Sequence, residues 1–125
     1  MGLNFDILKE SNPALYELGT QMENNMFSDR DASAQYGSDF LDAFMKEVYA
    51  KEGMNYGYKT FMTKNIFELK NEGIISPEVQ KLMEKAKILR DYIMEKNGSR
   101  DRILALRSTL VDLSAWFYER YEANN

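Results

Sequence analysis

The sequence predicts an all-α protein: an up-and-down helical bundle of about five helices, formed by a single domain over residues 1–125. Apolar residues recur at three- and four-residue steps in successive segments, which is the spacing of one helix face. Cap residues and glycines separate these segments. No sustained alternation of β-branched residues indicates a strand. The loops between the segments are short, which favours antiparallel neighbours.

The first two helices are marked by their caps and apolar stripes. Asn12 and Pro13 suit the N-cap and first position of a helix. Apolar residues then follow at helical spacing: Leu15, Leu18, Met22 and Met26. Residues 28–31 supply caps for a second helix over residues 32–51. Its apolar positions form two adjacent stripes: Tyr36, Phe40, Phe44 and Val48 in one, and Leu41, Met45 and Tyr49 in the other. A face this wide predicts a central helix.

A loop and a third helix follow. Residues 52–58 are typical of a loop, because they hold two glycines and show no periodicity. The third helix is expected from about Thr60 to Glu72, with Gly73 placed to end it in a left-handed cap. Its expected inward positions are Phe61, Ile66 and Leu69.

The last two helices have clear boundaries. The Ser-Pro-Glu sequence at 76–78 combines an N-cap, a proline at the first position and an acid in the first turn. The inward positions that follow are Val79, Leu82, Met83, Ala86, Leu89 and Ile93. Residues 97–98 (Asn-Gly) are expected to stop this helix, and Ser99 or Asp101 to cap the last one. The core positions of that helix are expected to be Ile103, Leu106, Leu110, Leu113, Phe117 and Tyr121.

We expect the second and fifth helices to lie at the centre of the bundle. The side chains that should then be buried are Phe40, Phe44, Leu106, Leu110 and Leu113.

The chemistry open to the chain is limited by its composition, because the 125 residues contain no histidine and no cysteine. These side chains supply most of the bases, nucleophiles and soft metal ligands that work near neutral pH. Ser-His and Cys-His enzymes and zinc sites built from imidazole or thiolate are therefore excluded. Carboxylate pairs remain on two helical faces, Asp39 with Asp42 and Glu68 with Glu72, and acids of this kind are mostly solvated. We expect no catalytic residue, no metal and no cofactor.

The charge balance bears on the class of partner. The net charge is −4, which argues against a dedicated nucleic-acid binder. Residues 81–107 are locally basic, but their interspersed acids are typical of ion pairs within a helix. No apolar run approaches the ~18 residues of a membrane span, and the lack of cysteine fits a reducing compartment. We expect a cytoplasmic protein with weak or no nucleic-acid binding and no membrane partner.

The C-terminal segment concentrates aromatic side chains that cannot all face one core: Trp116, Phe117, Tyr118 and Tyr121. Part of this helix is therefore expected to meet a neighbouring helix or a partner. Aromatic and arginine side chains are the usual anchors of protein interfaces, and the loop at 52–58 carries two further tyrosines. The candidate partner-binding residues are Trp116, Tyr118, Arg90, Arg100, Tyr56 and Tyr58.

Short motifs spread over nearly the whole chain point to a known family. In the N-terminal half they are residues 3–8 (LNFDIL), Leu18-Gly19, Met22-Glu23 and Asp29 before the long second helix. In the C-terminal half they are Leu69 with residues 73–75 (GII), then Leu89-Arg90, then residues 115–118 (AWFY) with Tyr121. Their order resembles the N-terminal helical domain of type I restriction endonuclease motor subunits and related helicases. This resemblance implies a non-catalytic accessory domain that contacts an adjacent nuclease or helicase domain or another protein, and a homodimer is a further alternative.

That family is distantly similar to the HEPN helical bundles, some of which are ribonucleases that use an Arg and a His a few residues apart. Arg90 matches the HEPN arginine, but residues 91–100 (DYIMEKNGSR) contain no histidine. They also lack the Gly-Asn-x-Ala-x-His element of the restriction-subunit family. Ser38 and Asp42 stand where the family tends to show Arg and Glu. The resemblance thus implies that nuclease chemistry is absent here. Two alternatives remain: a free-standing inhibitor or antitoxin, and a divergent HEPN-type ribonuclease that works through Arg90, Lys96, Arg100 or Tyr92.

Overall fold

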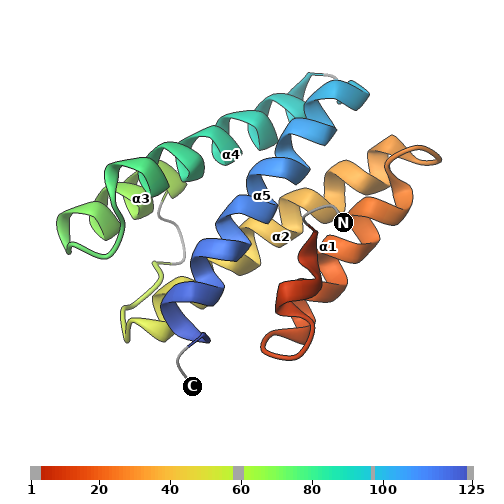
Figure 1. Ribbon diagram of the computed structural model, residues 1–125. Coiled ribbons are helices and arrows are strands. Elements are labelled where there is room, and N and C mark those ends of the chain that lie inside the picture. Colours follow the sequence, from red (N-terminus) through yellow and green to blue (C-terminus); the bar gives the residue numbers. More distant parts are fainter. Residues whose placement is uncertain (1–3, 58–60, 97, 124–125) are drawn as a thin grey trace.

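Helices make up most of the computed structural model, which describes residues 4–57, 61–96 and 98–123 (Figure 1). In chain order they are the 3-10 helix η1 (Phe5–Leu8) and the α-helices α1 (Pro13–Asn25), α2 (Arg30–Lys51), α3 (Met62–Asn71), α4 (Pro77–Glu95) and α5 (Arg100–Tyr121). No strand occurs within these described ranges, and the predicted all-α bundle is confirmed. None of the described helices is long and apolar enough to cross a membrane.

The helix starts follow from local capping. Asn12 and Asp29 each accept a hydrogen bond, through a side-chain oxygen, from the backbone N–H three residues later. Ser76 and Ser99 cap α4 and α5 in the same way through their hydroxyl oxygens. Such a cap satisfies one of the N–H groups that the first turn leaves unpaired. Beyond the end of α3, Gly73 has a φ of 74°, the left-handed conformation that glycine adopts without strain.

The centre of the bundle is formed by α2 and α5, as the sequence predicted (Figure 1). These two helices run in the same direction, because Leu106 lies beside Gly37 and, further along both helices, Phe117 packs against Phe44. Antiparallel partners flank them, α1 on α2 and α4 on α5. In sequence α3 follows α2, but it packs on α4, at the edge of the molecule away from α1 (Figure 1).

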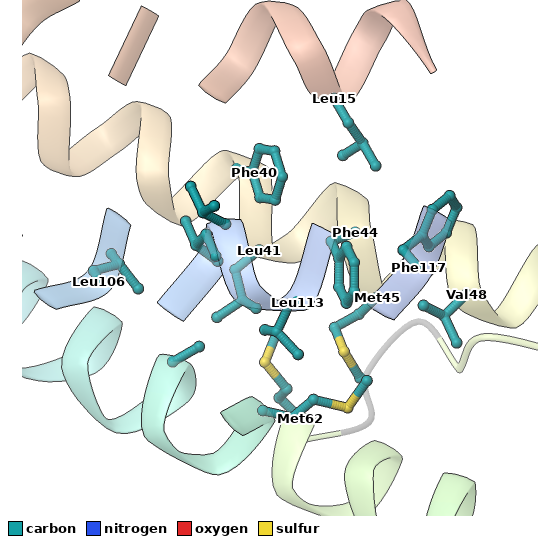
Figure 2. Close-up of a cluster of buried hydrophobic side chains, with 14 of the residues drawn as sticks. Leu15, Phe40, Leu41, Phe44, Met45, Val48, Met62, Leu106, Leu113 and Phe117 are labelled. Atoms are coloured by element: carbon teal, nitrogen blue, oxygen red, sulfur yellow. The ribbon is translucent and has the colours of Figure 1, made fainter. Parts of the chain in front are cut away.

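The core between these helices holds the side chains that the sequence placed there (Figure 2). Each of the predicted central residues is buried: Phe40, Phe44, Leu106, Leu110 and Leu113. The rings of Phe40 and Phe44 stack with their centroids 6.3 Å apart, and Phe44 meets Phe117 at 5.6 Å. Removing a side chain of this size from water contributes about 1.5–3 kcal/mol. These contacts therefore account for much of the packing of α2 against α5.

One predicted core position is wrong. Phe61 is exposed by 83% instead of facing inward. The first residue of α3 is Met62, and the buried stripe of this helix is Met62, Ile66 and Leu69. Phe61 is the N-cap residue of α3 and has an extended backbone, so its side chain does not follow the buried stripe of the helix. Thr60, the predicted start of this helix, and Asn97, the predicted stop of the next, lie outside the described residues.

The helix η1 is an element that periodicity does not predict, because four residues are too few to show a repeat. Phe5 and Leu8 of η1 are buried. The ring of Phe5 lies 4.9 Å from that of Phe40 and packs so closely on Gly19 that a Cβ at residue 19 would overlap it. The N-terminal segment is thus part of the core.

Candidate functional site

Arg90 is the candidate residue with the most defined surroundings. Its side chain is 15% exposed and reaches from α4 to α2. There Nη1 lies 3.0 Å from Asp42 Oδ1 and 3.4 Å from Ser38 Oγ. On α4 itself, Arg90 Nε donates to Asp91 Oδ1 at 2.8 Å, and Lys87 pairs with the other oxygen of Asp91 at 2.7 Å. The guanidinium therefore ties two helices together.

The resolved pKa shifts in this cluster point away from proton transfer at neutral pH. Burial alone would lower the pKa of Arg90, but hydrogen bonds to Asp91 and Asp42 together raise it. Burial opposes the ionised form of Asp91, yet its bonds from Lys87 and Arg90 hold the pKa of this carboxyl below its usual value. Burial, together with the charge of Asp42, raises the pKa of Tyr56. A general acid or base needs the opposite tuning, toward neutrality.

The other arginines of the 81–107 stretch are engaged in separate contacts. Arg107 of α5 pairs with Glu23 of α1, with Nε 2.8 Å from Oε2. The guanidinium of Arg102 lies 4.2 Å from the ring centroid of Tyr92, and that of Arg100 lies 5.2 Å from the ring of Phe27. The stretch therefore does not line one groove.

The C-terminal aromatic residues pack mostly against the bundle. Trp116 is half-buried, with its ring 6.3 Å from Phe44 and 5.9 Å from Tyr121. Tyr121 donates to Glu52 Oε2 at 2.6 Å, beside the bond from Arg120 Nε at 2.8 Å. The bond from Arg120 is the main cause of the lowered pKa of Glu52.

Tyr118 and the loop tyrosines complete the predicted set. Tyr118 is half-buried beside η1, where it lines a hollow of ≈ 440 Å³ together with Ile7 and Lys9. Tyr56 is half-buried with its ring 5.1 Å from that of Tyr49. Tyr58 lies outside the described residues. The structure thus brings Arg90 and Tyr56 together around Asp42, whereas Arg100 and the pair of Trp116 and Tyr118 lie elsewhere.

Several exposed apolar side chains on or beside the neighbouring helices α3 and α4 were not among the predicted partner-binding residues. Phe61 and Phe67 are exposed by 83% and 60% on or beside α3, and Ile88 by 65% on the neighbouring α4. Tyr92, one turn after Ile88, is also exposed. We call these four residues the α3–α4 face. A sequence signal existed: Phe67 and Ile88 are apolar but fall outside the buried stripes of their helices.

Two hollows flank α3. The hollow on the α4 side measures ≈ 200 Å³ and is mainly apolar, lined by Thr63, Ile66, Glu84, Lys87 and Ile88. The hollow on the other side, toward the segment after α2, measures ≈ 390 Å³ and is lined by Asn55, Gly57, Lys64, Asn65, Phe67, Glu68, Asn71 and Glu72. We call the second one the acidic hollow.

Tyr49 of α2 closes the inner side of α3 next to the acidic hollow. Its hydroxyl lies 2.5 Å from Glu68 Oε1 and 3.0 Å from the backbone oxygen of Asn65, and both oxygens accept from it. Asn65 Nδ2 in turn donates to the Tyr49 oxygen at 3.4 Å. Burial, followed by the bond to Glu68, raises the pKa of Tyr49 to about 12.

The carboxylate pairs noted in the sequence are spread over the surface. Asp39 accepts from Gln35 at 2.9 Å, and Asp42 accepts from Arg90. Across the described ranges, no group of three or more Asp or Glu side chains lies close enough to hold a metal ion.

No protein-family model, curated protein or solved structure matches the chain.

Proposed function

We propose that this chain is a non-catalytic helical interaction domain that binds another protein through the α3–α4 face. The observation that carries the proposal is the exposure of three apolar side chains, Phe61, Phe67 and Ile88. Each of them has most of its surface in contact with water. Exposed apolar patches of this kind mark interaction sites more often than chance. Full burial of one such side chain contributes about 1.5–3 kcal/mol, which offsets part of the cost of association.

The shape of this face suits a partner helix. The hollow between α3 and α4 is lined by the buried Ile66, the exposed Ile88 and the charged residues Glu84 and Lys87. A groove between two helices can receive the apolar side of an amphipathic helix, and a charged rim around an apolar centre is the usual anatomy of an interface. Tyr92, with a guanidinium stacked on its ring, extends the same face.

Charge favours a protein over a nucleic acid as the partner. The chain carries a net charge of −4, and two arginines of its basic stretch are paired with its own acids, Arg90 with Asp42 and Arg107 with Glu23. Neutralising phosphates supplies most non-specific nucleic-acid affinity, and paired arginines contribute little to it.

The biological setting of this contact rests on the sequence resemblance alone. It places the domain in a restriction or helicase system, with an adjacent nuclease or helicase domain as partner. A free-standing inhibitor or antitoxin, or a homodimer, would use the same face. The divergent ribonuclease is kept as a second candidate on one observation: Arg90, which matches the HEPN arginine, lies in a polar cluster with Ser38 and Asp42.

Site-specific photo-crosslinking in cells tests the proposal. A benzophenone amino acid replaces Phe61 or Ile88, and the matched control replaces Phe27, which is 69% exposed at the turn between α1 and α2. We expect both positions on the face to give the same discrete adduct, identifiable by mass spectrometry, and the control to give none. No adduct from Phe61 and Ile88, or equal adducts from all three positions, would contradict the proposal.

A further inference from the structure

The acidic hollow holds a buried acceptor without a partner. Asn65 is 2% exposed and lines this hollow, and its Oδ1 forms no hydrogen bond within the described chain. Its Nδ2 is turned to the Tyr49 oxygen. The single proton of that hydroxyl is shared between Glu68 and the backbone oxygen of Asn65, so Tyr49 has none for Oδ1. Buried polar atoms are rarely left unpaired, and a donor that enters the hollow would satisfy this one.

The charges around the hollow favour a cation. Glu68 of α3 and Glu72, the C-cap residue of that helix, are four residues apart and both line the hollow, where two like charges repel. Neither carboxylate forms an ion pair with a residue of the described ranges. Lys64 is the only basic residue among the described lining residues. A bound cation would relieve the repulsion between the two carboxylates.

The aromatic wall distinguishes an organic cation from a metal ion. Phe67 lines the hollow and is 60% exposed. A planar guanidinium stacks on an aromatic ring and donates in parallel to carboxylate oxygens. Among the described residues, only two carboxylates, Glu68 and Glu72, line the hollow, and no group of three or more Asp or Glu side chains is placed to hold a metal ion.

We propose that the acidic hollow binds the guanidinium of an arginine carried by the protein partner. Phe67 stacks on the guanidinium, Glu68 and Glu72 accept its outer N–H groups, and Asn65 Oδ1 accepts one at the floor. This inference rests on the proposed function, because α3 separates the hollow from the apolar groove with Ile88. A segment crossing α3 can fill both at once.

The test is an NMR titration of the full chain with N-acetyl-arginine methylamide, followed on the Asn65 side-chain amide and the backbone amides of α3. The uncharged control ligand is N-acetyl-citrulline methylamide, which has nearly the same shape. We expect saturable shifts at Asn65, Phe67 and Glu68 with the arginine probe only. E72Q should raise its dissociation constant by about fivefold or more, which corresponds to about 1 kcal/mol. The charge-matched control E78Q, at an exposed carboxylate on α4, should leave it unchanged.

Four results would overturn the inference. The arginine probe gives no saturable shifts, citrulline shifts the same residues equally, E78Q acts like E72Q, or magnesium chloride or adenosine monophosphate displaces the probe from the hollow. These outcomes leave cross-linking at Phe61 and Ile88 untouched, because neither residue lines the hollow. Failure of the hollow and failure of the α3–α4 face are therefore distinguishable.

Discussion

Arg90 of α4 and Asp42 of α2 form a salt bridge between helices, with Nη1 3.0 Å from Oδ1. The arginine lies near the end of one helix and the aspartate in the middle of another, 48 residues apart in sequence. The position that the HEPN resemblance associates with nuclease chemistry thus holds a side chain engaged in helix packing.

Replacing Arg90 by Ala is expected to lower the free energy of unfolding by about 1–3 kcal/mol, because it removes the arginine donor of Asp42 and leaves Asp91 with Lys87 alone. The half-exposed side chain of Asp42 regains water, which places the loss toward the lower end of that range. Urea unfolding of R90A, D42N and the double variant measures it. Strict additivity of the two single changes would contradict a direct coupling between these residues.

The purified protein is expected not to cleave RNA or DNA, with or without magnesium, because the chain lacks histidine and Arg90 is held between carboxylates. Incubation with labelled single-stranded and duplex substrates checks this. Cleavage that disappears in R90K, with the circular-dichroism spectrum unchanged, would support the ribonuclease alternative instead.

Replacing Gly19 by Ala is expected to destabilise the protein by up to about 2 kcal/mol, because overpacking a core usually costs about 1–3 kcal/mol and the change also improves helix propensity. The added methyl group overlaps the Phe5 ring near its attachment point, where the side chain cannot give way. This cost exceeds the gain of about 1 kcal/mol from the better helix propensity of Ala. Thermal unfolding of G19A measures it, and F5A should abolish the penalty. A stabilised G19A would show that η1 does not pack on α1.

The Tyr49 phenol is expected to lose its proton at a higher pH than an ordinary tyrosine. Its pKa is 10.0 in the unfolded chain and about 12 in the folded one. Because the folded pKa is the higher one, this group contributes its full stabilisation below pH 10 and loses it as the pH rises to about 12. The ultraviolet absorbance of tyrosinate, recorded together with circular dichroism, measures this change. If Y49F lost as much stability as the wild type over this pH window, Tyr49 would not contribute to the change.

Most of the fold could be predicted from the sequence because its rules are local. Caps at Asn12 and Ser76 and the double stripe of α2 each depend on residues a few positions apart. The burial of Phe5 could not be predicted, because it depends on a gap at Gly19 that only the assembled helices reveal. Phe61 is exposed because α3 begins at Met62, two residues after the predicted start. The spacing of apolar residues does not locate the start of a helix this accurately.

The candidate site was harder to predict than the fold. Hydrophobicity marked Trp116 as a surface candidate, yet its ring packs largely on Phe44 and Tyr121. Similarly, Arg90 appeared in the sequence as one base of a charged stretch, whereas its ion-pair partner lies on another helix. Phe67 and Ile88 were the more useful sequence signal, since each is an apolar residue outside the buried stripe of its own helix.

Binding of a protein partner by the α3–α4 face is tested most directly by the affinity of the F61A variant. The partner identified by cross-linking is titrated by calorimetry against the wild type, F61A and the matched control F27A. We expect F61A to weaken binding by about 30-fold or more, equivalent to the 2 kcal/mol of a hot spot, with an unchanged melting temperature, and F27A to bind like the wild type. Wild-type affinity in F61A, or an equal loss in F27A, would contradict the account.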